Sequence, residues 1–286
     1  MLTHTTSFIK SGHFSLKTIE SQQTVGGDTL LIIGSADYYH RVMPSNLSDH
    51  FHCIFVDHRG FAPCSQEVTS EDISLSQVTL DIAKICDSYG IKKCWVLGHS
   101  GHAYMALDFA ASYPDLILGI ILIGASPNLS NDMQALQFAR WNKEASSSRK
   151  HTFEQNINQL QSDIDTEPER KFVHLCRRLG AMRWFNAGFD EMPLWEGLIT
   201  HTPLLDKLWG ETFAELDISA YSSSIKSPVL IISGEYDYSI APLSAWYNIS
   251  PNFVDVRYQV IKNSAHTPMY EQPKAFLNTL LGFTHA

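Results

Sequence analysis

An apolar run that ends in Gly98-His99-Ser100-Gly101 constrains this chain more than any other feature. The run begins at Cys94, and a helix-forming segment, residues 103–111, follows almost at once. This pattern predicts a strand, a very tight turn and a helix, with Ser100 at the apex of the turn. Glycine suits such a turn because a residue with a Cβ is strained there. The serine hydroxyl would be exposed, beside backbone N–H groups at a helix N-terminus.

Two further polar segments follow predicted strands nearer the C-terminus. Residues 228–234 predict a buried strand that ends shortly before Asp237, and residues 256–261 predict another that ends shortly before His266. In open α/β sheets, ligands and chemistry collect at the carboxyl ends of the strands. We therefore expect Ser100, Asp237 and His266 to meet at one edge of the sheet.

A serine, a histidine and a carboxylate can together carry out nucleophilic catalysis. The hydroxyl of Ser100 is a poor nucleophile until a base removes its proton, and His266 is the candidate base. Asp237 would fix the imidazole tautomer and stabilise the imidazolium. Glu235 and Asp255 are the competing carboxylates. Asp237 is favoured over Glu235 because residues two apart share a face only while the strand continues.

The same edge offers candidate groups for binding a developing oxyanion. The backbone N–H of Gly101 is one donor, and that of Ser35, after a predicted strand over residues 28–33, is the other. Tyr38 and Tyr39 follow Ser35, and they either line the mouth of the site or pack beneath a loop. His102, beside the serine, either tunes the site or packs under it.

Several of these segments resemble motifs of the α/β-hydrolases. The turn at Ser100 resembles their Gly-x-Ser-x-Gly motif, except that His102 replaces the last glycine, and residues 57–65 resemble their Asp-x-Arg-Gly-x-Gly-x-Ser signature. The segments around Asp237 and His266 are similar to the proline iminopeptidase and carboxylesterase branches. The resemblance covers roughly residues 10–127 and 226–286. It implies a structural role for residues 57–65, and acyl transfer at the serine, where a dehalogenase or epoxide hydrolase would carry aspartate.

Alternating strand and helix patterns predict the matching architecture. We expect an α/β-hydrolase fold with a mostly parallel central sheet, helices on both faces and an inserted helical cap. The predicted division is a core over residues 1–125, a cap over 126–225 and the rest of the core over 226–286. In the middle part strand signals vanish. Predicted there are helices over residues 131–145, 153–164 and 168–179, with a connecting loop over 146–150.

Composition narrows the class of protein further. The formal net charge of −9 disfavours binding to nucleic acid or to an anionic membrane surface. The five cysteines form no Cys-x-x-Cys pair, and the histidines show no metal-ligand spacing, so we expect no metal and no cofactor. The N-terminal residues lack a signal-peptide pattern and no apolar run is long enough to span a bilayer, which predicts a cytoplasmic protein.

These observations predict a serine hydrolase that cleaves a small carboxylic ester through an acyl-enzyme on Ser100. Its partner would be a small-molecule ester or a short peptide. One alternative is a proline iminopeptidase-like aminopeptidase, in which Glu191 and Glu196 are candidates for holding a substrate ammonium group. Two exposed glutamates on a helix face are the commoner explanation of such a pair. The other alternative is a ligand-sensing or partner-binding protein on this fold, with slow turnover.

Overall fold

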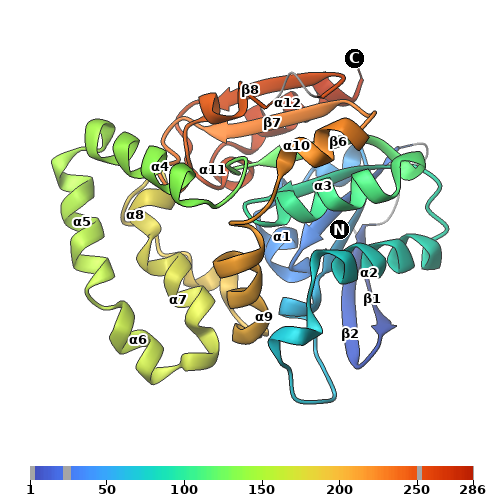
Figure 1. The fold of residues 1–286 in the computed structure, drawn as a ribbon, viewed down its shortest axis with the longest axis horizontal. Helices are drawn as coiled ribbons and strands as arrows, with labels where there is room; N and C mark the ends of the chain where they lie inside the picture. Colours follow the sequence, from blue (N-terminus) through green and yellow to red (C-terminus); the bar gives the residue numbers. More distant parts are fainter. Residues whose placement is uncertain (1–3, 22–26, 250–252, 286) are drawn as a thin grey trace.

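A central sheet organises the protein, which is described by a computed structural model over residues 4–21, 27–249 and 253–285 (Figure 1). The sheet has eight strands in the order β1-β2-β4-β3-β5-β6-β7-β8. The pairs β1–β2 and β2–β4 are antiparallel, and all other neighbouring strands are parallel. The strands are β1 (His4–Ser11), β2 (Phe14–Ser21), β3 (Thr29–Gly34), β4 (His52–Asp57), β5 (Cys94–His99), β6 (Ile117–Ile123), β7 (Val229–Gly234) and β8 (Val256–Ile261).

Helices cover both faces of this sheet, because the side chains of a strand alternate between two apolar cores. Leu31 and Ile33 of β3 enter the core beneath α2 and α3, whereas Leu30 and Ile32 enter the core beneath α1 and α12. The predicted α/β-hydrolase architecture is confirmed. The helices of this layer are α1 (Ala36–Val42), α2 (Leu75–Ser88), α3 (His102–Ser112), α11 (Pro268–Glu271) and α12 (Pro273–Thr284).

The segment between β6 and β7 is helical, and within its described residues no strand forms. Figure 1 shows α5, α6 and α7 to one side of the sheet. The division into a core and a cap at residues 126 and 225 stays a prediction. The helices of the segment are α4 (Asn131–Glu144), α5 (Ser147–Ile157), α6 (Leu160–Thr166), α7 (Lys171–Arg178), α8 (Gly180–Arg183), α9 (Thr202–Lys207) and α10 (Ile218–Ser224).

Two details of this segment correct the expectations from the sequence. The stretch 146–150 is not a loop, because Ser146 acts as the N-cap of α5 and its Oγ accepts a hydrogen bond from the N–H of Arg149. The expected single helix over 153–164 is divided between α5 and α6. The serines at 146–148 therefore mark the start of a helix. No helix of the described residues is long and apolar enough to cross a membrane.

Candidate active site

The turn between β5 and α3 holds Ser100 in a strained conformation. Its φ is 57°, in the left-handed region that residues other than glycine rarely adopt. The backbone N–H of Ser100 donates to the carbonyl of Ile123 on the neighbouring strand at 2.8 Å, which anchors the turn. A Cβ on Gly98 would lie 2.3 Å from the carbonyl oxygen of His102, so the close approach of strand and helix requires glycine at that position.

Asp237 and His266 are joined in the buried interior next to this turn. The Nδ1 of His266 lies 2.9 Å from Oδ2 of Asp237, and both side chains are essentially inaccessible to solvent. Burial alone would raise the pKa of Asp237, but the charge of His266 and hydrogen bonds from His266 and Ser239 lower the pKa below its ordinary value. The carboxylate therefore stays ionised and can orient the imidazole.

The two competing carboxylates lie elsewhere. The side chain of Glu235 accepts from the N–H of Asn263, and Asp255 forms a surface ion pair with Arg257 at 3.6 Å. Of these three acids, all within the described residues, only Asp237 contacts the imidazole of His266. Ser100 and His266 line the same cavity, although no hydrogen bond joins these two described residues. Such bonds often tighten only when substrate binds.

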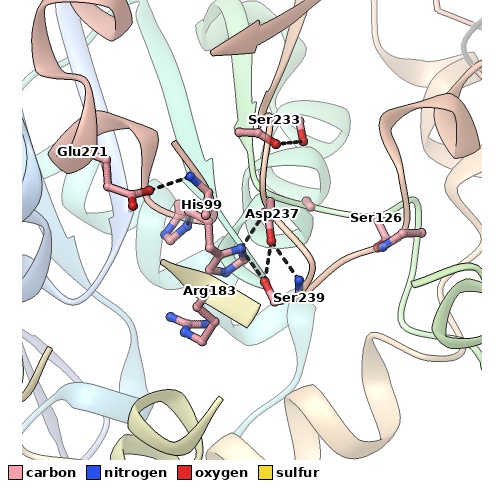
Figure 2. Close-up of polar contacts among 12 residues, drawn as sticks. His99, Ser126, Arg183, Ser233, Asp237, Ser239 and Glu271 are labelled. Carbon is pink, nitrogen blue, oxygen red and sulfur yellow. Dashed lines mark hydrogen bonds and ion pairs between the residues drawn. The ribbon is translucent and has the colours of Figure 1, made fainter. Parts of the chain in front are cut away.

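Two residues that sequence reasoning missed brace the acid and the histidine (Figure 2). Ser239 donates from its N–H and its hydroxyl to Oδ1 of Asp237, at 3.0 and 2.6 Å, and its Oγ lies 3.0 Å from Nδ1 of His266. Glu271 accepts from the N–H of Ala265 at 2.7 Å and from that of Phe185 at 2.6 Å. Neither residue had a sequence signal beyond its closeness in the chain to the predicted site.

The candidate oxyanion donors lie around the same cavity. Ser35 ends the turn after β3 and caps α1, and Ser35 and Gly101 both line the cavity with Ser100. Asp57 anchors the turn after β3, because its Oδ1 accepts a hydrogen bond from the N–H of Ala36 at 2.6 Å. Burial raises the pKa of Asp57 to about 8. This contact matches the bracing role that the family resemblance implied for its segment.

The cavity beside Ser100 has a volume of about 200 Å³ and is lined mainly by apolar and aromatic side chains. Several come from the helical segment between β6 and β7, including Phe172, Trp195 and Trp209. The predicted residues Tyr38, Tyr39 and His102 also line it, and the two tyrosines do so from α1. Within the described part of the chain, Arg183 is the one arginine or lysine that lines the cavity, and no carboxylate does so.

Four polar side chains form a buried chain of hydrogen bonds from the loop after β4 to His266. The N–H of Gly60 donates to Nδ1 of His58 at 3.0 Å, and the Nε2 atoms of His58 and His102 lie 3.2 Å apart. Nδ1 of His102 lies 2.8 Å from the hydroxyl of Tyr39. That hydroxyl is 3.2 Å from Nδ1 of His99, whose Nε2 is 2.8 Å from the carbonyl oxygen of His266.

The fixed ends of this chain assign every proton along it. His58 accepts at Nδ1, so its proton is on Nε2 and is donated to His102, which then donates from Nδ1 toward Tyr39. A carbonyl only accepts, so His99 carries its proton on Nε2 and accepts from Tyr39 at Nδ1. Burial lowers the pKa of all three histidines, for His102 to about 3, and keeps them neutral. His102 is thus a member of a buried hydrogen-bonded chain next to the site.

The two glutamates considered for an ammonium site lie away from the cavity surface. Glu191 is 1% exposed, and its Oε2 accepts from Nε1 of Trp195 at 3.1 Å. Its Oε1 lies 3.5 Å from Nε of Arg183. Glu196 is exposed, and neither glutamate lines the cavity.

Comparisons with known proteins agree with this architecture. The model of the alpha/beta hydrolase fold family matches residues 32–273. The AB hydrolase superfamily protein YclE of Bacillus subtilis (strain 168) is 38% identical over 250 residues, which cover 87% of this chain and 89% of that protein.

Solved structures share the fold at low sequence identity. VinJ superposes with a TM-score of 0.76 at 15% identity, and the match covers 98% of each chain. The proline iminopeptidase of Mycobacterium smegmatis has a TM-score of 0.72 at 13% identity, also over 98% of each chain. The esterase EaEST of Exiguobacterium antarcticum has a TM-score of 0.67 at 15% identity and is covered completely, by 99% of this chain. With a family model over most of its length and a close relative in YclE, the chain belongs to the α/β-hydrolase fold family and is a hydrolase of that fold.

Proposed function

We propose that this hydrolase cleaves a small carboxylic ester through an acyl-enzyme on Ser100. The observation that carries the proposal is the buried pair of Asp237 and His266 beside a cavity that also contains Ser100. Nε2 of His266 is buried and has no hydrogen-bond partner among the described residues. A histidine held at Nδ1, with Nε2 unoccupied, is arranged to accept the proton of a nucleophile.

The reaction would proceed in two steps, acylation of Ser100 and hydrolysis of the acyl-enzyme. Ser100 Oγ attacks the ester carbonyl while His266 takes its proton, and the resulting oxyanion is held by the N–H groups of Ser35 and Gly101. The C–O bond to the alcohol breaks as His266 returns the proton to the leaving oxygen. Water then attacks the acyl-enzyme by the same route, and the carboxylic acid is released.

The lining of the cavity favours an ester over a peptide with a free N-terminus. An aminopeptidase needs a carboxylate to hold the ammonium group of its substrate, and no carboxylate side chain lines the cavity in the described part of the chain. Glu191 is already engaged by Trp195 and Arg183. A mostly apolar cavity of about 200 Å³ suits a small acyl or alcohol group instead.

Labelling with a fluorophosphonate tests the proposal directly. We expect the wild-type protein to be labelled on the peptide that contains Ser100, and Ser100→Ala and His266→Ala to lose the label although both remain folded by circular dichroism. Labelling at another residue, or none on the folded wild type, would refute the assignment.

Turnover then separates the three functions. With 4-nitrophenyl butyrate we expect many cycles per protein molecule, and with proline 4-nitroanilide much slower release of product. A faster anilide reaction would favour the aminopeptidase. A single slow cycle with retained product would favour a sensor.

A further inference from the structure

The guanidinium of Arg183 has an unusual position for a charged group. Arg183 ends α8, and its backbone carbonyl accepts a hydrogen bond from the N–H of His266 at 2.7 Å. Its side chain is only 11% exposed and lines the cavity that holds Ser100. Figure 2 shows it near the hydrogen-bonded group of Asp237 and Ser239. A cation is therefore built into the wall of an otherwise mainly apolar cavity.

The hydrogen-bond donors of this guanidinium are largely unused. Nε of Arg183 lies 3.5 Å from Oε1 of Glu191, and no hydrogen bond joins any of the guanidinium nitrogens to a described residue. Two other arginines that are buried or half-buried use more of their donors. Arg149 donates to three backbone carbonyls, and Arg178 forms a two-point contact with Asp163. Unused donors on a buried cation are costly unless a ligand fills them.

A second donor stands in the same wall. The hydroxyl of Tyr38 is buried beside the buried hydroxyl of Thr267, and neither makes a hydrogen bond of normal geometry with a described residue. Its ring packs on Trp195 with centroids 4.3 Å apart, which fixes its position in the cavity lining. Tyr38 and Arg183 are close enough to interact electrostatically. The cavity lining thus contains both an O–H donor and a guanidinium.

The chemistry of these donors points to a carboxylate. Arginine stays charged at any accessible pH, and its planar fork matches the two oxygens of a carboxylate. Glu191 approaches at Nε, which leaves the two terminal nitrogens for a ligand. Because no protein carboxylate lines the cavity within the described residues, an anionic ligand would meet no repulsive side chain at its surface.

We propose, on the basis of the ester hydrolysis proposed above, that Arg183 and Tyr38 bind a free carboxylate that the substrate carries besides its scissile ester. Such substrates are half-esters of dicarboxylic acids, or esters of hydroxy acids. Hydrolysis consumes one water and yields the dicarboxylic acid and an alcohol in the first case, or a carboxylic acid and a hydroxy acid in the second. The free carboxylate stays intact and orients the ester toward Ser100.

Matched substrates test this assignment. The mono-4-nitrophenyl ester of glutaric acid is compared with 4-nitrophenyl pentanoate, and acetoxyacetate with its methyl ester, which places the carboxylate on either side of the ester. We expect the wild type to hydrolyse at least one of the two carboxylate-bearing esters with a kcat/KM roughly tenfold to a hundredfold above that of its neutral counterpart. This factor is the one expected for hydrogen bonds to a charged group. Equal or lower kcat/KM for both carboxylate-bearing esters, relative to their neutral counterparts, would overturn the proposal. A higher kcat/KM for methyl 5-oxohexanoate, a neutral ketone of similar shape, than for monomethyl glutarate would also overturn it.

Variants assign the preference to its residue. Arg183→Met should reduce the ratio of kcat/KM between the charged and neutral esters by a similar factor. The control Arg177→Met, at a partly exposed arginine of the adjacent helix α7 that does not line the cavity, should leave the ratio unchanged. An unchanged ratio in Arg183→Met would refute the role of Arg183. If that variant fails to fold because Glu191 loses its partner, the double variant Arg183→Met/Glu191→Gln removes both charges and is expected to lose the preference equally. The wild-type comparison is decisive even without either variant.

A binding measurement separates this proposal from the proposed function. Calorimetric titration of Ser100→Ala with glutarate and with pentanoate reports the carboxylate site without turnover. Tighter binding of glutarate, lost in Arg183→Met, would support the site even in a protein that hydrolyses no ester. Turnover of neutral esters with no difference between glutarate and pentanoate would overturn the carboxylate site and leave ester hydrolysis standing.

Discussion

Replacing Gly234 with alanine should displace the proposed catalytic histidine. Gly234 is the last residue of β7, and a Cβ built there would lie 1.9 Å from the carbonyl oxygen of Ala265, the residue before His266. Real Cβ atoms essentially never approach another atom within 3.0 Å, so the loop must retreat by about 1 Å. A misplacement of about 1 Å in a catalytic group costs roughly a hundredfold in rate. Gly234→Ala should therefore lower kcat/KM about a hundredfold.

The assay is hydrolysis of 4-nitrophenyl butyrate, together with thermal unfolding to show that the variant is folded at the assay temperature. Gly282→Ala is the matched control, because a Cβ on Gly282 in α12 meets no atom within 4 Å. That control should keep wild-type activity and gain about 0.5–1 kcal/mol in unfolding free energy, since alanine is the better helix former. A folded Gly234→Ala with activity within threefold of wild type would refute the reasoning about the His266 loop.

Three further substitutions probe the buried polar groups. Asp237→Asn should lower kcat by about a thousandfold or more, because the amide cannot stabilise the imidazolium and favours the wrong tautomer, and a loss below tenfold in a steady-state ester assay would contradict its role. Asp57→Asn should flatten the pH dependence of stability: the folded-state pKa is raised from 3.8 to about 8, so the wild type loses stability as pH rises across that window, by up to about 1.4 kcal/mol per pH unit. Urea unfolding of both proteins at pH 5 and pH 8 measures this difference. An equal change in unfolding free energy in the wild type and the variant would contradict the prediction. His102→Phe should lower the unfolding free energy by roughly 2–5 kcal/mol, because it removes the buried acceptor for Nε2–H of His58 and the buried donor to the hydroxyl of Tyr39. A decrease of less than about 1 kcal/mol in a urea titration would contradict the proposed chain.

Features that depend on local pattern were predictable from the sequence. The strand, turn and helix around Ser100 follow from an apolar run, two glycines and a helix-forming segment, and the structure has them as β5 and α3. The loops after β7 and β8 carry Asp237 and His266 as expected, at one edge of the sheet. These predictions required only the order of short segments.

Features that depend on pairing across the fold were not predictable. The partner of Glu191 is Arg183, eight residues away along an irregular stretch, and nothing in local periodicity indicates their contact. The residue type of Glu191 and Glu196 suggests an ammonium site, but only the fold shows which groups surround them. The bracing by Ser239 and Glu271 likewise depends on distances that only the folded chain defines.

The chain of hydrogen bonds from His58 to His266 has a consequence for how this protein tolerates change. Each member has one proton and one acceptor position committed to its neighbours, so a substitution at one position alters what the next residue can accept. The effects of single and double substitutions along it should therefore be strongly non-additive. Histidine at position 102, in place of the more familiar glycine, belongs with Tyr39 and His58 as a set. Relatives that carry glycine there would be expected to differ at the other positions too. Exchanging a single residue between such proteins would leave a buried donor or acceptor without a partner and would not transfer the hydrogen-bonded chain.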